Sequence, residues 1–337
     1  MFKKAILYFL FLFTGISTAQ IGGKYTYQFL NLIASPRQAA LGGRIITNYD
    51  YDVTQPLINP ATLNPEMTNR LALNYVSFLG DVNYGSAAYS WNMKSSVLHG
   101  GVTYINYGNF DGRNEFGEDT GEFTGSEVAL SAGYSYNIPQ TNFYAGANVK
   151  IISSNLEQYN SFGGAMDLGF IYLDNLNCLN IGLVIRNIGF QLSTYAGERE
   201  KLPLEIALGV SQELRNVPIR WHVSFENLQD WGLAFANPAR TEVTIDGEEI
   251  PEKVTVVKEF FRHTIIGAEL FPNSGFNVRL GYNFRRGEEL RILEQRSFSG
   301  LSAGFGVRIN KIRFNYTYAR YSLAANTSFF GLMINLK

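Results

Sequence analysis

From about residue 70 to the end of the chain, apolar residues alternate with small or polar residues. In residues 143–151, one parity reads Phe, Ala, Ala, Val and Ile, and the other reads Tyr, Gly, Asn and Lys. Residues 276–284 repeat this pattern. Because successive side chains of a strand point to opposite faces, the alternation predicts strands with one apolar and one polar face. Sustained over most of a chain, it is typical of an antiparallel transmembrane β-barrel with lipid outside and a polar lumen.

The pattern divides into about fourteen strands of about 10–12 residues each, the length needed to cross a membrane at a tilt. We place them near residues 69–79, 82–92, 97–108, 126–137, 142–153, 162–173, 178–189, 203–213, 218–228, 259–271, 274–285, 297–309, 311–321 and 326–336. An even number of strands returns both ends of the barrel to one side, which we expect to be periplasmic. Because an unpaired edge is costly in lipid, the last strand should close against the first.

Tight turns alternate with longer connections along the strands. The longer connections fall near residues 109–125, 154–161, 190–202, 229–258 and 286–296. Short turns on one side and long loops on the other are typical of outer-membrane barrels, with the short side periplasmic. A β-sandwich has no reason to keep this alternation, and a propeller would need an internal repeat of roughly 40–50 residues, which the sequence lacks.

Residues 1–19 are typical of a secretory signal peptide. Lys3 and Lys4 precede an apolar run of about twelve residues, and Ser17-Thr18-Ala19 is a small-x-small cleavage site. The run is too short to span a bilayer, which needs about 20 apolar residues, so cleavage is favoured over an uncleaved anchor.

Residues 20–68 do not follow the strand pattern, and the predicted barrel occupies residues 69–337. Ser35 as N-cap, Pro36 and Arg37 in the first turn, and Gly42 and Gly43 as a stop predict a short helix. Asn59-Pro60-Ala61 follows as a predicted turn. A segment of this length before a barrel is more often a hatch plugging the lumen than a free periplasmic domain. Small residues on the predicted lumenal parity leave room for it: Gly146, Gly169, Gly209, Gly281, Gly304 and Gly306.

Polar and charged side chains, both acidic and basic, also occupy positions predicted to face the lumen or positions next to them. They are Lys150, Asp167, Glu205, Arg220, His222, Glu226, Arg279, Arg308 and Arg313. They could pair with one another and with the hatch, or they could line a hydrated pore. The net charge of −1 gives no electrostatic case for nucleic-acid binding. One cysteine and three scattered histidines favour neither an internal disulfide nor a metal site, and we expect no cofactor.

The sequence argues against an enzyme. Residues 300–304 match the Gly-x-Ser-x-Gly pattern of a nucleophile elbow, but Ser302 falls inside a predicted strand, whereas the motif needs a sharp strand-to-helix turn. The richest surface chemistry lies in the predicted loop 229–258, where Trp231, Leu233 and Phe235 are candidate partner-binding residues. A hairpin turning at Asp246-Gly247 is expected there, either projecting above the membrane or folding inward over the barrel mouth.

The signal peptide, the hatch, Asn59-Pro60-Ala61 and about fourteen strands resemble the FadL-like outer-membrane barrels. Within that group, the segment at residues 35–43, the Ala19-Gln20 junction and the length resemble the PorQ family of the type IX secretion system of the Bacteroidota. That resemblance implies a non-enzymatic outer-membrane component of a cell-surface attachment complex. The implied partners are outer-membrane lipid, a surface protease (PorU), a sister barrel (PorV) and a surface adaptor (PorZ). The alternative is a FadL-type channel for a hydrophobic small molecule, which the absence of a run of lumenal Phe or Leu disfavours.

Overall fold

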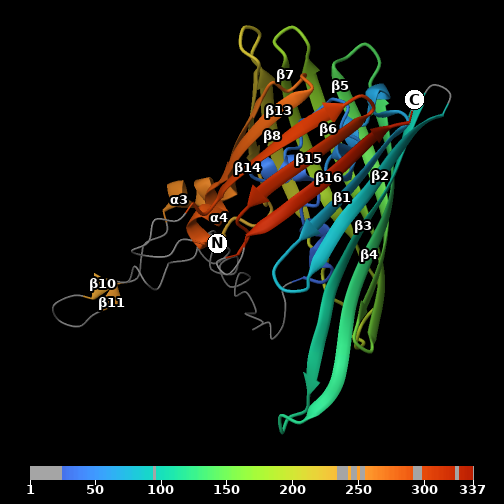
Figure 1. Cartoon of the computed structure of the whole chain (residues 1–337), viewed down its shortest axis with the longest axis vertical. Helices are drawn as coiled ribbons and strands as arrows, with labels where there is room; N and C mark the ends of the chain where they lie inside the picture. Colours follow the sequence, from blue (N-terminus) through green and yellow to red (C-terminus); the bar gives the residue numbers. More distant parts are fainter. Residues whose placement is uncertain are drawn as a thin grey trace, which may run out of the picture.

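The computed structural model describes residues 25–93, 96–233, 242–243, 249–250, 255–290, 298–322 and 326–336. Fourteen strands of this described part form one closed antiparallel barrel (Figure 1). The first strand, β1, pairs with the last, β16, from Arg70 opposite Asn335 to Ser77 opposite Ser328. The predicted fold class, the strand number and the closure of the last strand against the first are therefore confirmed. No helix among the described residues is long and apolar enough to cross a membrane.

The observed strands agree closely with the predicted ones in the barrel wall. They are β1 (Arg70–Ser77), β2 (Asn83–Met93), β3 (Ser96–Arg113), β4 (Asp119–Asn137), β5 (Phe143–Leu156), β6 (Tyr159–Asp174), β7 (Leu179–Ser193), β8 (Glu205–Glu213), β9 (Ile219–Phe225), β12 (Thr264–Leu270), β13 (Phe276–Asn283), β14 (Leu301–Ile309), β15 (Ile312–Ala319) and β16 (Thr327–Asn335). A separate two-stranded sheet joins β10 (Glu242–Val243) to β11 (Glu249–Ile250).

The alternation of side chains along the strands separates an apolar outer surface from a polar lumen. On β5, Phe143, Val149 and Ile151 are each more than half exposed, whereas Asn148 and Lys150 between them are buried. The exposed apolar side chains of neighbouring strands continue this surface around the barrel. An apolar belt of this kind is the surface that a lipid bilayer requires.

The two ends of the barrel differ, and we name them by their connections. The short-turn end, at the top of Figure 1, carries the C-terminal residues. It also carries the turns that follow β4, β6, β8, β12 and β14. The opposite, long-loop end holds the first described residues, because the backbone N–H of Thr26 donates to the carbonyl of Lys201 in the connection before β8. The two chain ends of the barrel, Arg70 and Asn335, are paired and lie on one side as expected, whereas the described N-terminal residues begin at the opposite end.

Two connections at the long-loop end differ from the sequence prediction. The predicted strand 259–271 begins as a helix, α3 (Val256–His263), because the Thr255 hydroxyl accepts a bond from the Lys258 N–H and caps it. A second helix, α4 (Phe284–Glu289), follows β13. The predicted loop 109–125 is mostly an extension of β3 and β4, which pair beyond the barrel wall.

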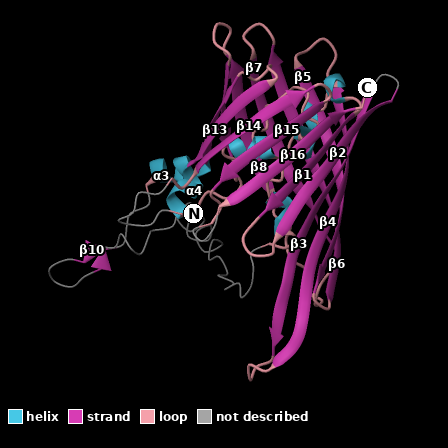
Figure 2. Cartoon of the chain, in the orientation of Figure 1, coloured by secondary structure: helices cyan, strands magenta, loops and turns pink. Residues whose placement is uncertain are grey.

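The segment from Tyr25 to Thr68, here called the hatch, lies inside the barrel (Figure 2). It contains one α-helical turn, α2 (Pro36–Ala40), and four 3₁₀ turns: η1 (Gln28–Asn31), η2 (Gln55–Leu57), η3 (Pro60–Thr62) and η4 (Pro65–Met67). The predicted short helix is confirmed, with Ser35 as N-cap and Pro36 in its first turn. Gly42 follows with φ +93°, a left-handed conformation that favours glycine.

Candidate functional site: the hatch and the lumen

Lumenal glycines bring the hatch backbone against the barrel wall. Gly146 of β5 and Gly169 of β6 face each other across the strand pair. A Cβ on Gly146 would collide with the backbone of Pro60 and Ala61, and one on Gly169 would collide with the Asn59 side chain. The Asn59 carboxamide accepts a bond from the Ala61 N–H and donates to the Ile46 carbonyl. Asn59-Pro60-Ala61 is therefore an ordered turn that fits a glycine groove.

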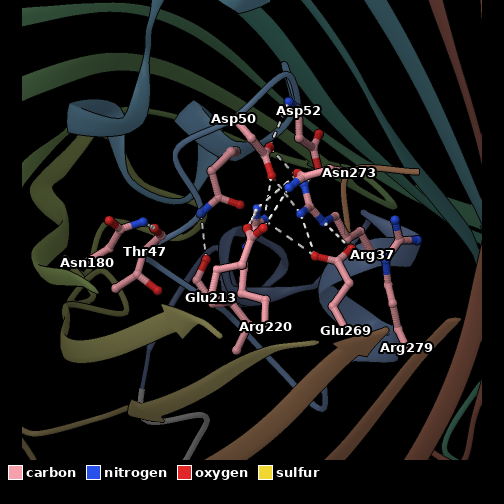
Figure 3. Close-up of polar contacts among 12 residues, drawn as sticks. Arg37, Thr47, Asp50, Asp52, Asn180, Glu213, Arg220, Glu269, Asn273 and Arg279 are labelled. Carbon is pink, nitrogen blue, oxygen red and sulfur yellow. Dashed lines mark hydrogen bonds and ion pairs between the residues drawn. The ribbon is translucent and has the colours of Figure 1, made fainter. Parts of the chain in front are cut away.

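A cluster of charged side chains fastens the hatch to the strands near the short-turn end (Figure 3). Arg37 donates to both carboxylate oxygens of Asp50, at 2.9 and 2.7 Å. The same guanidinium donates to both oxygens of Glu269 on β12, at 3.1 and 2.8 Å. Arg220 on β9 contacts Asp50 at 2.9 Å, and Arg279 on β13 contacts Glu269 at 2.7 Å. One hatch arginine thus connects a hatch carboxylate to a wall carboxylate.

Because this cluster is buried, breaking one of its ion pairs would cost more free energy than breaking an exposed pair. The Arg37, Glu269 and Arg279 side chains are at most 3% exposed. Burial alone would raise the pKa of the Asp50 carboxyl, but attraction to Arg37 and Arg220 and the hydrogen bonds that it accepts hold the pKa well below its usual range. Asp50 is therefore ionised at neutral pH, and the cluster is held as a set of ion pairs.

A second network joins the hatch to the wall in the lumen. Arg44 contacts Glu205 of β8 at 2.5 Å and Glu226, just after β9, at 3.4 Å. Arg186 of β7 contacts the other Glu205 oxygen at 2.7 Å and donates to the carbonyl of Leu30. Three charged groups of the wall and one of the hatch therefore neutralise one another, and Arg44 and Glu226 keep a small exposed fraction.

A third charged pair belongs to the wall itself. Lys150 of β5 contacts Asp167 of β6 at 2.7 Å and donates to the Asn187 carboxamide at 2.9 Å. Asn187 has φ +58°, and its N–H donates to Asp167 at an irregular point in the β6–β7 pairing. Its side chain also donates to Asn31 of the hatch. The irregularity thereby turns a wall residue towards the hatch.

The remaining predicted lumenal residues differ in their burial and in their contacts. His222 is buried, but neither ring nitrogen has a hydrogen-bond partner among the described residues. Arg313 is buried, and its guanidinium lies 4.5 Å from the centre of the Tyr51 ring. Arg308 is exposed near the short-turn end. Sequence reasoning omitted Arg44, Arg186, Glu213 and Glu269, although Glu269 shares the strand parity of other buried positions on β12.

An apolar cluster lies in the half of the lumen towards the long loops, beside the Arg44–Glu205–Arg186 network. There the hatch residues Tyr27, Phe29, Leu30 and Ile33 pack among apolar wall residues. The wall residues of this cluster are Val76, Tyr84, Ile105, Ala129, Ile152, Ala165, Leu202, Ala319 and Phe329. The lumen, which was predicted to be polar, therefore also contains an apolar cluster around the hatch. Phe329 of β16 is fully buried against Tyr321.

A space of about 440 Å³ lies between the hatch and the wall at the short-turn end, lined by residues that include Tyr49, Leu63 and Tyr134, but the space deeper in the lumen is small. A lumenal cavity of about 40 Å³ is lined by residues that include Leu30, Ala129 and Lys150. Ligand pockets for drug-sized molecules occupy roughly 300–1,000 Å³. A cleft of about 570 Å³ opens instead at the long-loop end, among hatch residues, α3 and α4. Its lining is largely polar and includes Arg44, Glu226, Arg262 and Arg286.

The predicted partner-binding residues are only partly described. The Trp231 ring stacks on the His263 ring with centroids 4.5 Å apart, and about half of Trp231 remains exposed. The Leu233 N–H donates to the Glu259 carboxylate of α3. Phe235 and the Asp246-Gly247 turn lie outside the described residues. Val256 and Val257, at the end of the same predicted loop, belong to α3.

The groups singled out as possible chemistry lie in the wall. Ser302 is buried within β14, and its hydroxyl donates to the Gly281 carbonyl at 3.4 Å. It therefore lacks the exposed strand-to-helix turn of a nucleophile elbow. Among the described residues, no group of three or more His, Cys, Asp or Glu side chains is arranged to hold a metal ion.

Solved structures with the same arrangement are outer-membrane transporters. The toluene transporter TbuX of Ralstonia pickettii matches with a TM-score of 0.53 and 15% identity, over 90% of this chain and 97% of the transporter. The toluene transporter TodX of Pseudomonas putida matches with a TM-score of 0.53 and 14% identity, over the same shares. No protein-family model and no curated protein sequence matches this chain. At these identities the likeness establishes the fold alone, a closed β-barrel.

Proposed function

We propose that this protein is a plugged outer-membrane barrel that anchors a cell-surface protein assembly through its long-loop end. The observation that carries the proposal is the fastening of the hatch by buried ion pairs on three wall strands, β8, β9 and β12. A barrel closed in this way supplies a rigid membrane anchor, and connections on a rigid scaffold are where recognition usually resides.

The sequence resemblance indicates which cell-surface assembly the barrel would anchor. The segment at residues 35–43 and Asn59-Pro60-Ala61, which resemble the PorQ family, are the parts of the hatch that contact the wall most closely. On this proposal the barrel is a non-enzymatic component of the type IX secretion system. Its partners would be surface proteins resembling PorU, PorV and PorZ.

Uptake of a hydrophobic small molecule is the second candidate. Two observations favour it: the toluene transporters share the fold, and an apolar cluster surrounds the hatch towards the long-loop end. On this alternative the hatch residues 27–34 would occupy the substrate's place until a substrate displaced them. The comparisons support transport more than they support secretion, whereas the packed lumen and the charged fastening of the hatch support a permanent plug.

Purification of the tagged barrel from detergent-solubilised outer membranes separates the two candidates. The anchor proposal predicts recovery of stoichiometric surface proteins, identified by mass spectrometry as resembling PorU, PorV or PorZ. Deletion of residues 236–252 should leave a heat-modifiable barrel and abolish that recovery. In parallel, vesicles containing the barrel should take up toluene or oleate no faster than empty vesicles. Hydrophobic uptake by the barrel without any stoichiometric partner would refute the anchor proposal in favour of transport.

A further inference from the structure

Strands β3 and β4 continue beyond the barrel as a free two-stranded ribbon, residues 109–124 (Figure 1). The neighbouring strands stop earlier: β2 pairs with β3 only as far as Asn106, and β5 pairs with β4 only from Gly125. Both outer edges of the ribbon therefore lack a neighbouring barrel strand. An irregularity between Asn106 and Asn109, with Gly108 at φ +81°, marks the point where the ribbon leaves the wall.

One face of the ribbon is aromatic and flat. Phe110 and Phe123 are directly opposed, and their rings stack with centroids 5.3 Å apart. Both are exposed, at 43% and 37%. Gly112 and Gly121, the next opposed pair on this face, add no side chains. At the tip, Phe116 is 87% exposed. Exposed rings on a projecting element are typical anchors of protein interfaces.

The other face and the tip are acidic. Asp111 lies directly opposite Glu122, and like charges in that position destabilise a strand pair. Residues 109–124 hold five carboxylates and one guanidinium, a net charge of −4. A ribbon that tolerates this repulsion is suited to basic groups supplied from outside. An anionic lipid surface, by contrast, would repel it.

The tip is held in one conformation by local bonds. The Asn114 carboxamide accepts from the N–H groups of Phe116 and Glu118, at 3.0 and 2.9 Å. The Asp119 carboxylate accepts from the Gly121 N–H at 2.8 Å. An isolated two-stranded hairpin is only marginally stable, so this ordering reduces the entropy lost on binding.

We propose that this ribbon docks a protein partner whose surface carries Lys or Arg side chains around an apolar groove that receives Phe116. The inference rests on the proposed anchor function and names a surface for it distinct from the loop 229–258. The carboxylates would steer the encounter, and the aromatic face would hold the complex.

The test places a photo-crosslinking phenylalanine analogue at position 116 of the full-length protein in native outer membranes. The matched control is position 298, an equally exposed phenylalanine towards the same end, between α4 and β14. We expect an adduct from position 116, mapped by mass spectrometry to one surface protein at a groove flanked by Lys or Arg, and none there from position 298. Adducts only with lipid, or only with a second copy of this chain, would overturn the proposal, as would no adduct.

Charge reversal then tests the electrostatic part of the proposal. The double variant Asp111→Lys with Glu122→Lys should lower the adduct yield from position 116 at least tenfold at low salt, with a smaller difference at high salt. Phe116→Ser in the otherwise unchanged protein should weaken recovery of the partner, and Phe298→Ser should not. Each variant must stay heat-modifiable, which the position of the ribbon outside the wall predicts. Full recovery of partners by the ribbon variants would refute this inference and leave the anchor function standing.

Discussion

Removal of the Arg37 guanidinium is the most direct test of whether the hatch is fastened. Arg37→Gln removes four hydrogen bonds, two to Asp50 and two to Glu269. Breaking a buried ion pair by deleting one partner typically costs about 3–5 kcal/mol, because it leaves an uncompensated buried charge. Arg220 and Arg279 still contact the two carboxylates, so we expect the lower end of that range.

A cost of about 3 kcal/mol corresponds to an increase of roughly 100-fold in the open fraction of the hatch. Hydrogen exchange measures this at the α2 amides, where the N–H of Ala39 bonds to Ser35 and that of Leu41 bonds to Arg37. Protection there should fall about 100-fold, while protection of the β15 and β16 amides stays unchanged. Bilayer recordings of the same variant should show intermittent ion conductance that the wild type lacks.

Arg285→Gln is the matched control. Arg285 contacts Glu289 at 2.7 Å, but these side chains are 38% and 44% exposed. A solvent-exposed pair contributes at most about 1 kcal/mol, so protection of the hatch should change less than about fivefold. If Arg37→Gln changed protection of the α2 amides no more than Arg285→Gln does, the fastening of the hatch by the buried cluster would be refuted.

Two further predictions concern the hatch. Because the folded pKa of Asp50 is depressed, its contribution to stability is fully present above the unfolded value of about 4 and declines as pH falls towards the folded value. Hydrogen exchange of α2 corrected for intrinsic rates should therefore show a loss of protection below about pH 4 that is absent from Asp50→Asn; an equal loss in that variant would contradict the role of Asp50. Gly169→Val should expose residues 59–61 to protease without loss of heat-modifiability, because its side chain would displace Asn59. Gly164→Ala on the same strand, whose Cβ would have its nearest neighbour at 3.8 Å, should behave as wild type.

The barrel could be predicted from the sequence because its rule is local and repeated. Every wall strand must alternate, so the parity that contrasts Phe143 with Lys150 already separates lipid from lumen. The ribbon was missed because Asp111, Gly112 and Gly121 are poor strand residues. Its pairing depends on the β3–β4 hairpin already formed in the wall. Likewise α3 depends on a single cap, Thr255, within a β-branched run that reads as a strand.

The charged partners of the hatch could not be predicted, because their pairing joins residues far apart in sequence. Arg37 and Glu269 are separated by 232 positions, and Arg44 and Glu205 by 161. Nothing in their local sequence distinguishes a buried ion pair from hydrated pore lining, which were the two alternatives for such residues. What decides between them is whether the hatch fills the lumen and excludes water, which is a property of the assembled fold.

The positions of the wall glycines do, however, indicate the path of the hatch. Pro36 lies against Gly331 of β16, and Ala40 lies against Gly304 of β14. Hatch residues 41–42 then lie against the paired glycines 267 and 281. Residues 46–47 lie against the pair 182 and 209, and residues 59–61 lie against the pair 146 and 169. Between residues 36 and 47 the strand number falls as the hatch residue number rises, and residues 57–61 then lie against β3, β5 and β6. The hatch therefore runs around the inner wall from the last strands towards β5. Glycines at lumenal positions of adjacent strands can be recognised in an amino-acid sequence, and a pair of them in register indicates where a backbone, rather than a side chain or water, fills the barrel.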